Sequence, residues 1–223
     1  MTGRRLTLVG FALVLAACSS TPPAPDWQGN ARSAIEAATK AYLMGDARAH
    51  AAAMAQARSA IASTGRADLL ARAELMRCAA LVASLVFEPC ARFEPLRADA
   101  VDAERAYADH LAARPLSRED IARLPAAQQA AAAAVAGGDM PLAGLQAIDD
   151  PLSRLIAVAV LFQSGKASPA MIDLATDTAS AQGWRRPLLA WLKVQALRAE
   201  KAGDPGEVQR LQRRISLVEG ATT

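Results

Sequence analysis

Aromatic residues, histidines and cysteines are all scarce in this chain of 223 residues. Phe, Trp and Tyr together make up 4% of it, and there are only two histidines and three cysteines. The low aromatic content leaves no stacking platform for single-stranded nucleic acid. His50 and His110 lie far apart in the sequence, with no Cys, Ser or Glu at a recognisable spacing. We therefore expect both histidines to be groove or surface residues, and we expect no metal site.

Two further catalytic patterns are missing. The chain has no serine in the glycine-flanked turn of hydrolases, and Gly165-Lys166 lacks both the upstream glycine and the following Ser or Thr of a phosphate-binding loop. We therefore expect no cofactor and no enzymatic activity.

Runs of alternating β-branched residues are also absent, whereas Ala, Leu, Arg, Glu and Gln dominate the chain. These residues have high helix propensity, and their apolar members recur at helical spacing. The sequence therefore predicts an all-α fold with no β-sheet.

The N-terminus has the order of a secretory signal. Arg4 and Arg5 precede an uncharged apolar run over residues 6–17, which is shorter than the roughly 20 residues that a membrane-spanning helix needs. The run ends in Leu15-Ala16-Ala17-Cys18, which resembles the lipobox of bacterial lipoproteins. This resemblance implies a signal peptide over residues 1–17, cleavage between Ala17 and Cys18, and lipid attachment at Cys18. The alternatives are an ordinary signal peptide with a chance cysteine and a partial twin-arginine signal.

The residues after the cysteine bear on location and charge. In the lipoprotein family, a residue other than Asp after the cysteine favours the outer membrane, and here that residue is Ser19. The resemblance thus implies a lipid anchor in the outer membrane, with the protein on the periplasmic face. Residues 18–26 are rich in proline and form a tether that reaches roughly 25 Å in polyproline geometry. Loss of Arg4 and Arg5 with the signal peptide lowers the net charge from +3 to +1, so we expect no nucleic-acid partner.

The remainder of the chain divides into two predicted helical halves. They cover residues 27–136 and 151–219, and a linker over 137–150 begins at Gly137-Gly138-Asp139. In the first half, Gly45 ends a helix and Asp46 caps the next one, which predicts an antiparallel hairpin. Helices are also predicted over 66–87, 94–114, 117–124, 126–136, 152–163, 168–182, 187–201 and 206–219. The helix over 152–163 has Arg154 as its one charged residue, so we expect it to be the central helix of the core.

The first hairpin resembles a degenerate tetratricopeptide repeat. The resemblance rests on Tyr42, Gly45-Asp46 and the spaced alanines. It implies a helical-hairpin array, an α-solenoid of about ten helices. Gly-Asp pairs recur at 45, 138 and 203, but their spacing is irregular.

Cys78 and Cys90 are the cysteines that remain after lipidation. An unbroken helix would place them ~18 Å apart, beyond the ~7 Å that a disulfide can span. A bridge therefore requires the third helix to end near Ser84. The oxidising periplasm favours a bridge, and two buried free thiols are the alternative.

The interaction candidates are Trp184, Arg185, Arg186 and Trp191. Two arginines at the N-terminus of a helix oppose its dipole, so other contacts must account for them. One hypothesis places them over the C-terminal carbonyls of the preceding helix, within reach of Asp177. The other makes the group an interaction hot spot, since Trp and Arg are enriched in hot spots.

Together these patterns predict a periplasmic lipoprotein that acts as a scaffold or adaptor for another envelope protein. The resemblance to tetratricopeptide-like lipoproteins, which serve in envelope assembly, supports this expectation. A cell-wall-associated enzyme or ligand-binding module is the alternative.

Overall fold

The computed structural model describes residues 25–220, so the predictions for the signal peptide, for Ala17 and Cys18, and for most of the tether lie outside the described residues. Within this range the chain forms eleven α-helices, one 3₁₀ helix and no β-strand, which confirms the all-α fold. None of the helices in the described range combines the length and apolarity needed to cross a membrane. The elements are α1 (Asp26–Met44), α2 (Ala47–Ala62), α3 (Ala67–Ala83), η1 (Glu94–Leu96), α4 (Asp102–Leu111), α5 (Arg118–Arg123), α6 (Ala126–Val135), α7 (Leu142–Gln146), α8 (Pro151–Gln163), α9 (Pro169–Ala181), α10 (Arg185–Ala202) and α11 (Pro205–Gly220).

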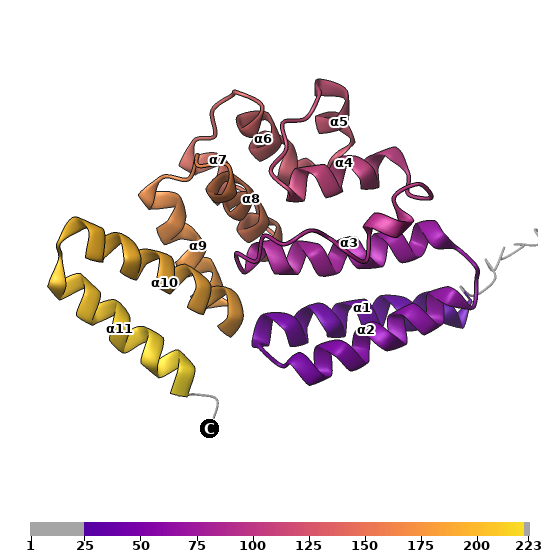
Figure 1. Ribbon diagram of the computed structural model, residues 1–223, viewed down its shortest axis with the longest axis horizontal. Helices are drawn as coiled ribbons and strands as arrows, with labels where there is room; N and C mark the ends of the chain where they lie inside the picture. Colours follow the sequence, from indigo (N-terminus) through magenta and orange to yellow (C-terminus); the bar gives the residue numbers. More distant parts are fainter. Residues whose placement is uncertain (1–24, 221–223) are drawn as a thin grey trace, which may run out of the picture.

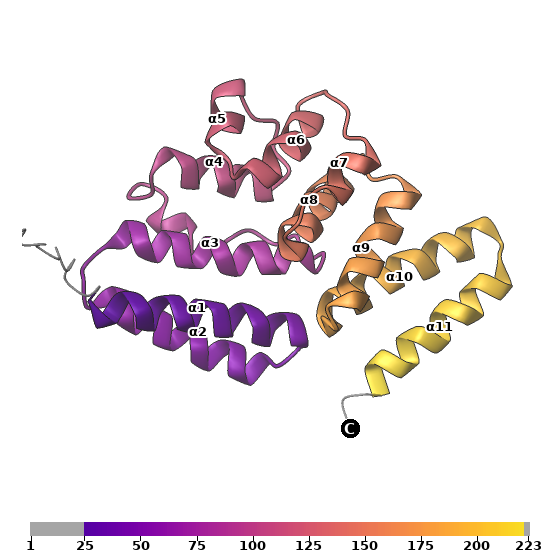
Figure 2. The ribbon, with the colours of Figure 1, turned by 180° about the vertical axis from the view of Figure 1, so that it is seen from behind.

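The helices follow one another along a curved path (Figure 1). α1 and α2 form an antiparallel hairpin, and α3 packs against both of them and against α4 and α8. α10 and α11 form a second hairpin, and α10 also contacts α1. The view from behind shows that the start of α1 and the turn between α10 and α11 lie at opposite ends of the molecule (Figure 2).

The predicted Gly-Asp boundaries at both hairpins are confirmed. Gly45 adopts a left-handed conformation with φ of 89°, and the Asp46 carboxylate accepts a hydrogen bond of 2.8 Å from the backbone N–H of Ala49. The second hairpin repeats this arrangement: Gly203 has φ of 68°, and Asp204 accepts a bond of 2.9 Å from the N–H of Glu207. In each case glycine permits the left-handed end of one helix and aspartate caps the next.

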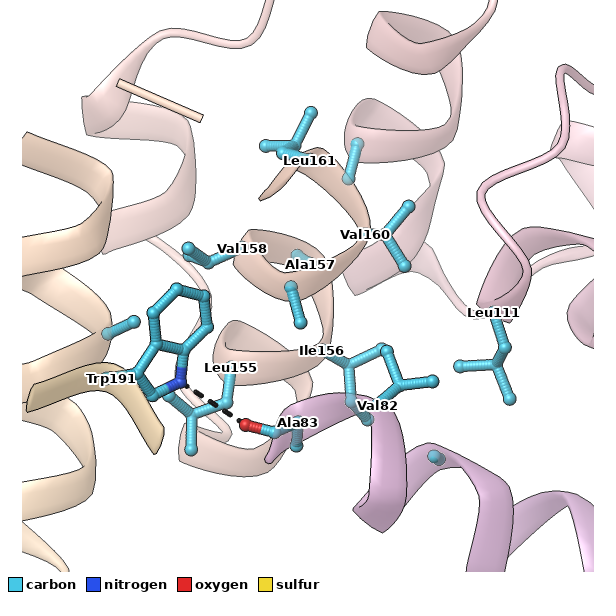
Figure 3. Packing of buried hydrophobic residues seen from close by; sticks show 14 of the residues in the cluster. Val82, Ala83, Leu111, Leu155, Ile156, Ala157, Val158, Val160, Leu161 and Trp191 are labelled. Atoms are coloured by element: carbon cyan, nitrogen blue, oxygen red, sulfur yellow. Dashed lines mark hydrogen bonds between the residues drawn. The ribbon is translucent and has the colours of Figure 1, made fainter. Parts of the chain in front are cut away.

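Helix α8 lies at the centre of the core, as predicted. Seven consecutive residues from Leu155 to Leu161 are buried, and α8 packs against α3, α4, α6, α7 and α9. Figure 3 shows side chains from α3, α4 and α10 converging on it. The same hydrophobic cluster runs from α3 to α11, so the two halves share one core across the loop at residues 137–139.

The prediction that the third helix reaches residue 87 is wrong. α3 ends at Ala83, where the N–H of Leu85 bonds to the carbonyl of Val82 and the N–H of Val86 bonds to that of Leu81. These two bonds form a Schellman motif, and Leu85 (φ 59°) occupies the left-handed position that usually holds glycine. The absence of charge between Cys78 and Phe87 therefore reflects burial of a turn as well as of a helix.

The fourth predicted helix, over 94–114, is also wrong as a continuous element. The structure has the short η1 helix, then an irregular segment, then α4. The Glu104 carboxylate accepts a bond of 3.2 Å from the N–H of Val101, and the acidic Asp102 and Glu104 lie in the first turn. This carboxylate capping at the N-terminus begins a new helix where sequence periodicity suggested a continuous one.

Candidate functional site

The predicted interaction residues Trp184, Arg185 and Arg186 lie where the start of α10 meets the end of α1. Arg186 Nε donates a hydrogen bond of 2.9 Å to the carbonyl of Tyr42, in the last turn of α1. The guanidinium carbon of Arg186 lies 4.3 Å from the centroid of the Tyr42 ring, a cation–π arrangement. The prediction that the arginines cover the preceding helix and reach Asp177 is therefore wrong for Arg186, which caps α1 instead.

Three other members of the predicted hot spot also have packing roles. Trp191 is fully buried in the core, and its indole Nε1 donates a bond of 3.3 Å to the carbonyl of Ala83 (Figure 3). The proposal of Trp191 as an interaction residue is therefore wrong, because no partner can reach it. Trp184 and Arg185 are half-buried. Trp184 packs against the core clusters, and the Arg185 guanidinium lies beside Gly45.

The two histidines lie in separate places. His50 is half-buried, and its Nδ1 lies 2.9 Å from the carbonyl of Ala38. His110 is 1% exposed, which corrects the expectation of a groove or surface residue. In the described part of the chain no group of three or more His, Cys, Asp or Glu side chains is arranged to hold a metal ion.

His110 belongs to a buried hydrogen-bond chain. Its Nε2 lies 3.0 Å from Gln128 Oε1, and Gln128 Nε2 donates a bond of 2.9 Å to the carbonyl of Ser153. Since Gln128 Nε2 is the donor to Ser153, Gln128 Oε1 accepts, and His110 Nε2 must carry the proton. Burial lowers the pKa of His110 below its ordinary 6.5, and the Gln128 bond offsets part of this effect.

This burial predicts a pH dependence of stability. The unfolded state binds a proton near pH 6.5 and the folded state only at lower pH, so the free energy of unfolding is highest above 6.5 and falls as the pH drops through that value. Urea unfolding followed from about pH 8 to about pH 5 should show this decline. In His110→Asn, the part of the pH dependence of the free energy of unfolding that is due to the imidazole should disappear. An unchanged pH dependence in this variant would contradict a buried neutral histidine.

Cys78 and Cys90 are joined by a disulfide, with their Cα atoms 5.9 Å apart. The helix end that such a bridge requires is present, since α3 stops at Ala83. Cys78 lies in the core and Cys90 in the segment between α3 and η1. The disulfide thus ties the returning segment to α3.

An apolar groove follows the exposed side of α3. It has two compartments that share Arg72 and Met76, one of about 590 Å³ beside α1 and the end of α2, and one of about 490 Å³ beside α4 and α8. We call it the α3 groove. Its lining includes Trp27, Ala31, Ile35, Ile61, Leu69, Ala73 and Met76 in the first compartment, and Leu75, Ala79, Tyr107, Leu124, Leu152 and Ile156 in the second.

Comparison with protein families, with characterised proteins and with solved structures finds no match to this chain.

Charged side chains hold the groove walls in place. Arg72 Nε lies 2.8 Å from Glu104 Oε1, so this ion pair links α3 to α4. Glu74, which is buried, is paired with Arg58 of α2 at 2.6 Å and with Arg77 at 3.3 Å. These ion pairs fix α3 relative to the helices on both sides of it.

The groove surface is suited to apolar side chains. Met76 is 38% exposed between the two compartments, and methionine adapts its shape to different partners. The second compartment also contains the Tyr107 hydroxyl, which is uncharged at physiological pH already at its ordinary pKa of 10.0. Burial raises this pKa further, with a smaller contribution from Asp150. The groove therefore offers apolar contact, and its lining also includes both arginine and carboxylate side chains.

This groove was not predicted from the sequence. A signal was present, because Leu69, Ala73 and Met76 recur at intervals of three and four residues and share a helix face. The uncharged second half of the helix suggested burial on several sides instead. Which parts of that face stay open depends on the placement of α1, α4 and α8.

Proposed function

We propose that this chain is a lipoprotein of the outer membrane that faces the periplasm and acts as a scaffold or adaptor for another envelope protein. Its anchor is a lipidated Cys18, and its binding surface is the α3 groove. The observation that carries the binding role is the pair of adjoining apolar compartments on either side of Met76. Grooves of this kind between helices accept the apolar face of a helix from a partner.

The lipid anchor rests on the Leu15-Ala16-Ala17-Cys18 motif. Each buried CH₂ of an acyl chain contributes about 0.8 kcal/mol, so two or more chains give stable attachment. Trp27, in the first turn of α1, lines the first compartment of the groove. With a tether that spans roughly 25 Å, the groove would lie close to the membrane and would meet membrane-associated partners.

A tetratricopeptide-like array is the architectural part of the proposal. It is supported by the two hairpins, α1–α2 and α10–α11, which share the Gly-Asp turn. The helices between them differ in length, and α5 and α7 are short. The repeat-like character would therefore be confined to the two ends.

The experiment that tests the anchor is fractionation of envelopes with a variant of the lipidated residue. The wild-type chain should sediment with outer membranes and yield a mature N-terminal peptide whose mass includes acyl chains. Cys18→Ala should leave an uncleaved or soluble chain without acyl mass, because the lipidated thiol is lost. Ser20→Ala is the matched control and should change nothing.

Ser19→Asp addresses the choice of membrane. It should retain the acylated chain in the inner membrane. Outer-membrane sedimentation of Cys18→Ala, or a wild-type N-terminus without acyl mass, would contradict the proposed anchor.

A further inference from the structure

A second cavity of about 380 Å³ lies outside the α3 groove and shares no lining residue with it. It is bounded by the segment that follows α3, by the end of α4 and by the end of α8. Its polar lining consists of Glu88, Glu94, Arg97, Arg114 and Gln163. The volume is within the range of pockets that hold small ligands.

Three helices end at this cavity. Its lining includes Val82 in the last turn of α3, Leu111 at the end of α4 and Gln163 at the end of α8. The C-terminus of a helix carries a partial negative charge and favours cations. The backbone around the cavity therefore favours a positively charged ligand.

Each of these helices ends in the same hydrogen-bond pattern. After α4, the N–H of Ala113 donates to the carbonyl of His110, and the N–H of Arg114 donates to the carbonyl of Asp109. After α8, the N–H groups of Gly165 and Lys166 donate in the same way to the carbonyls of Phe162 and Leu161. Together with the end of α3, these are three Schellman motifs. They fix the positions of the three helix ends around the cavity.

The two arginines of the lining are already engaged. Arg97 bonds to Glu94 at 2.8 and 2.9 Å and to Asp109 at 3.2 Å, and Arg114 bonds to Asp109 at 2.7 Å. The pKa of Glu94 is lowered mainly by its hydrogen bonds from Arg97, which is consistent with a stable pair.

Glu88 and Gln163 are the polar groups that remain. Glu88 is exposed, and its charge acts on the Tyr42 hydroxyl, whose pKa it helps to raise. Among the ion pairs and side-chain hydrogen bonds seen within residues 25–220, none involves the Glu88 carboxylate. Gln163 Oε1 is buried and accepts no hydrogen bond there. Both groups accept hydrogen bonds, so a ligand that donates them would satisfy both.

The rest of the lining is apolar. Val82, Phe87, Ala108 and Leu111 contribute to it, together with Cys90 of the disulfide. A ligand that matches both parts of the lining has an aliphatic chain and a charged group that donates hydrogen bonds.

We propose that this cavity binds a primary ammonium group on a short aliphatic chain. The ammonium group pairs with the Glu88 carboxylate near the three helix ends, and the methylene groups pack against Phe87 and Leu111. The chemistry is shared by a free diamine and by the lysine side chain of another protein. This role is separate from adaptor binding in the α3 groove, and either can fail without the other.

The test is calorimetric titration of the full mature chain, purified in detergent, with cadaverine. Saturable binding is expected, with at least a tenfold loss of affinity in Glu88→Gln, because the paired carboxylate is replaced by a neutral amide. Asp177→Asn is the matched control, since Asp177 is an exposed carboxylate on α9 that is remote in sequence from the cavity lining, and it should bind cadaverine as the wild type does.

Further probes separate the sources of the ligand. Titration with a short peptide that contains one lysine, compared with the same peptide acetylated at that lysine, shows whether the cavity accepts a protein side chain. Binding of cadaverine without binding of the peptide identifies a free amine as the ligand. Binding of the unacetylated peptide or of cadaverine alone supports the site. Tighter binding of glutarate than of cadaverine would show an anion site and overturn the proposal. The proposal also fails if Glu88→Gln leaves the affinity unchanged, if 1-pentanol binds equally well, or if neither amine probe binds.

Discussion

Replacement of Trp191 with alanine is expected to lower the free energy of unfolding by about 4 kcal/mol. The side chain is fully buried, and it packs edge-to-face on Phe162 with ring centroids 5.6 Å apart. Its truncation removes a large apolar surface and leaves a cavity beside α8. It also leaves the carbonyl of Ala83 without its indole donor, which adds to the loss.

Urea unfolding followed by circular dichroism measures this effect. Leu197→Ala is the matched control, because Leu197 lies on the same helix and is 57% exposed, so its truncation should change stability by less than about 0.5 kcal/mol. Trp191→Phe should fall between the wild type and Trp191→Ala. A Trp191→Ala protein of wild-type stability with reduced partner binding would contradict the core role and restore the hot-spot hypothesis.

Loss of the disulfide is the second large effect, expected at about 3 kcal/mol. Cys78 and Cys90 are separated by 12 positions, and the bridge restricts this loop in the unfolded chain. It also attaches the segment after α3 to the core. The double variant Cys78→Ala, Cys90→Ala should therefore unfold at lower urea concentration than the oxidised wild type.

A reducing agent provides the control for this comparison. It should lower the stability of the wild type toward that of the double variant and leave the double variant unchanged. Equal stability of oxidised wild type and double variant would contradict a stabilising bridge.

Local chemistry made several helix ends predictable. Ser117 caps α5 through a bond of 3.1 Å from the N–H of Asp120, and Asp150 caps α8 through a bond of 2.7 Å from the N–H of Ser153. Both caps depend on residues three positions apart, so the sequence contains all the information. The burial of α8 was also predictable from its own residues, because Arg154 is the one charged residue in the helix.

Contacts between distant segments were not predictable in this way. Trp191 meets Ala83, and Arg186 meets Tyr42, across more than a hundred positions of sequence. His110 is buried where Gln128 supplies its hydrogen-bond partner, and Gln128 in turn donates to the Ser153 carbonyl in the first turn of α8. A pattern of single residues gives no sign of such partners. This explains why His110 was expected to be a groove or surface residue and why Trp191 was an interaction candidate.

Whether a helix face is exposed or covered also depends on how the other helices pack against it. The α3 groove exists because α1 and α4 cover only part of the face that Leu69 and Met76 share. The cavity lined by Glu88 and Gln163 exists because the chain turns back after Ala83 and crosses the ends of α4 and α8. Both sites combine elements far apart in the chain.

The most direct test of an anchored adaptor is photo-crosslinking from Met76 in intact envelopes. A photoreactive residue at Met76, in the lipidated full chain, should form a covalent adduct with one defined envelope protein. The same residue at Arg118, which is exposed and outside the groove, should not form that adduct. Leu69→Asp should reduce the Met76 adduct at least tenfold, because a carboxylate would then be buried against an apolar partner. No adduct from Met76, or the same adducts from both positions, would contradict the proposed function.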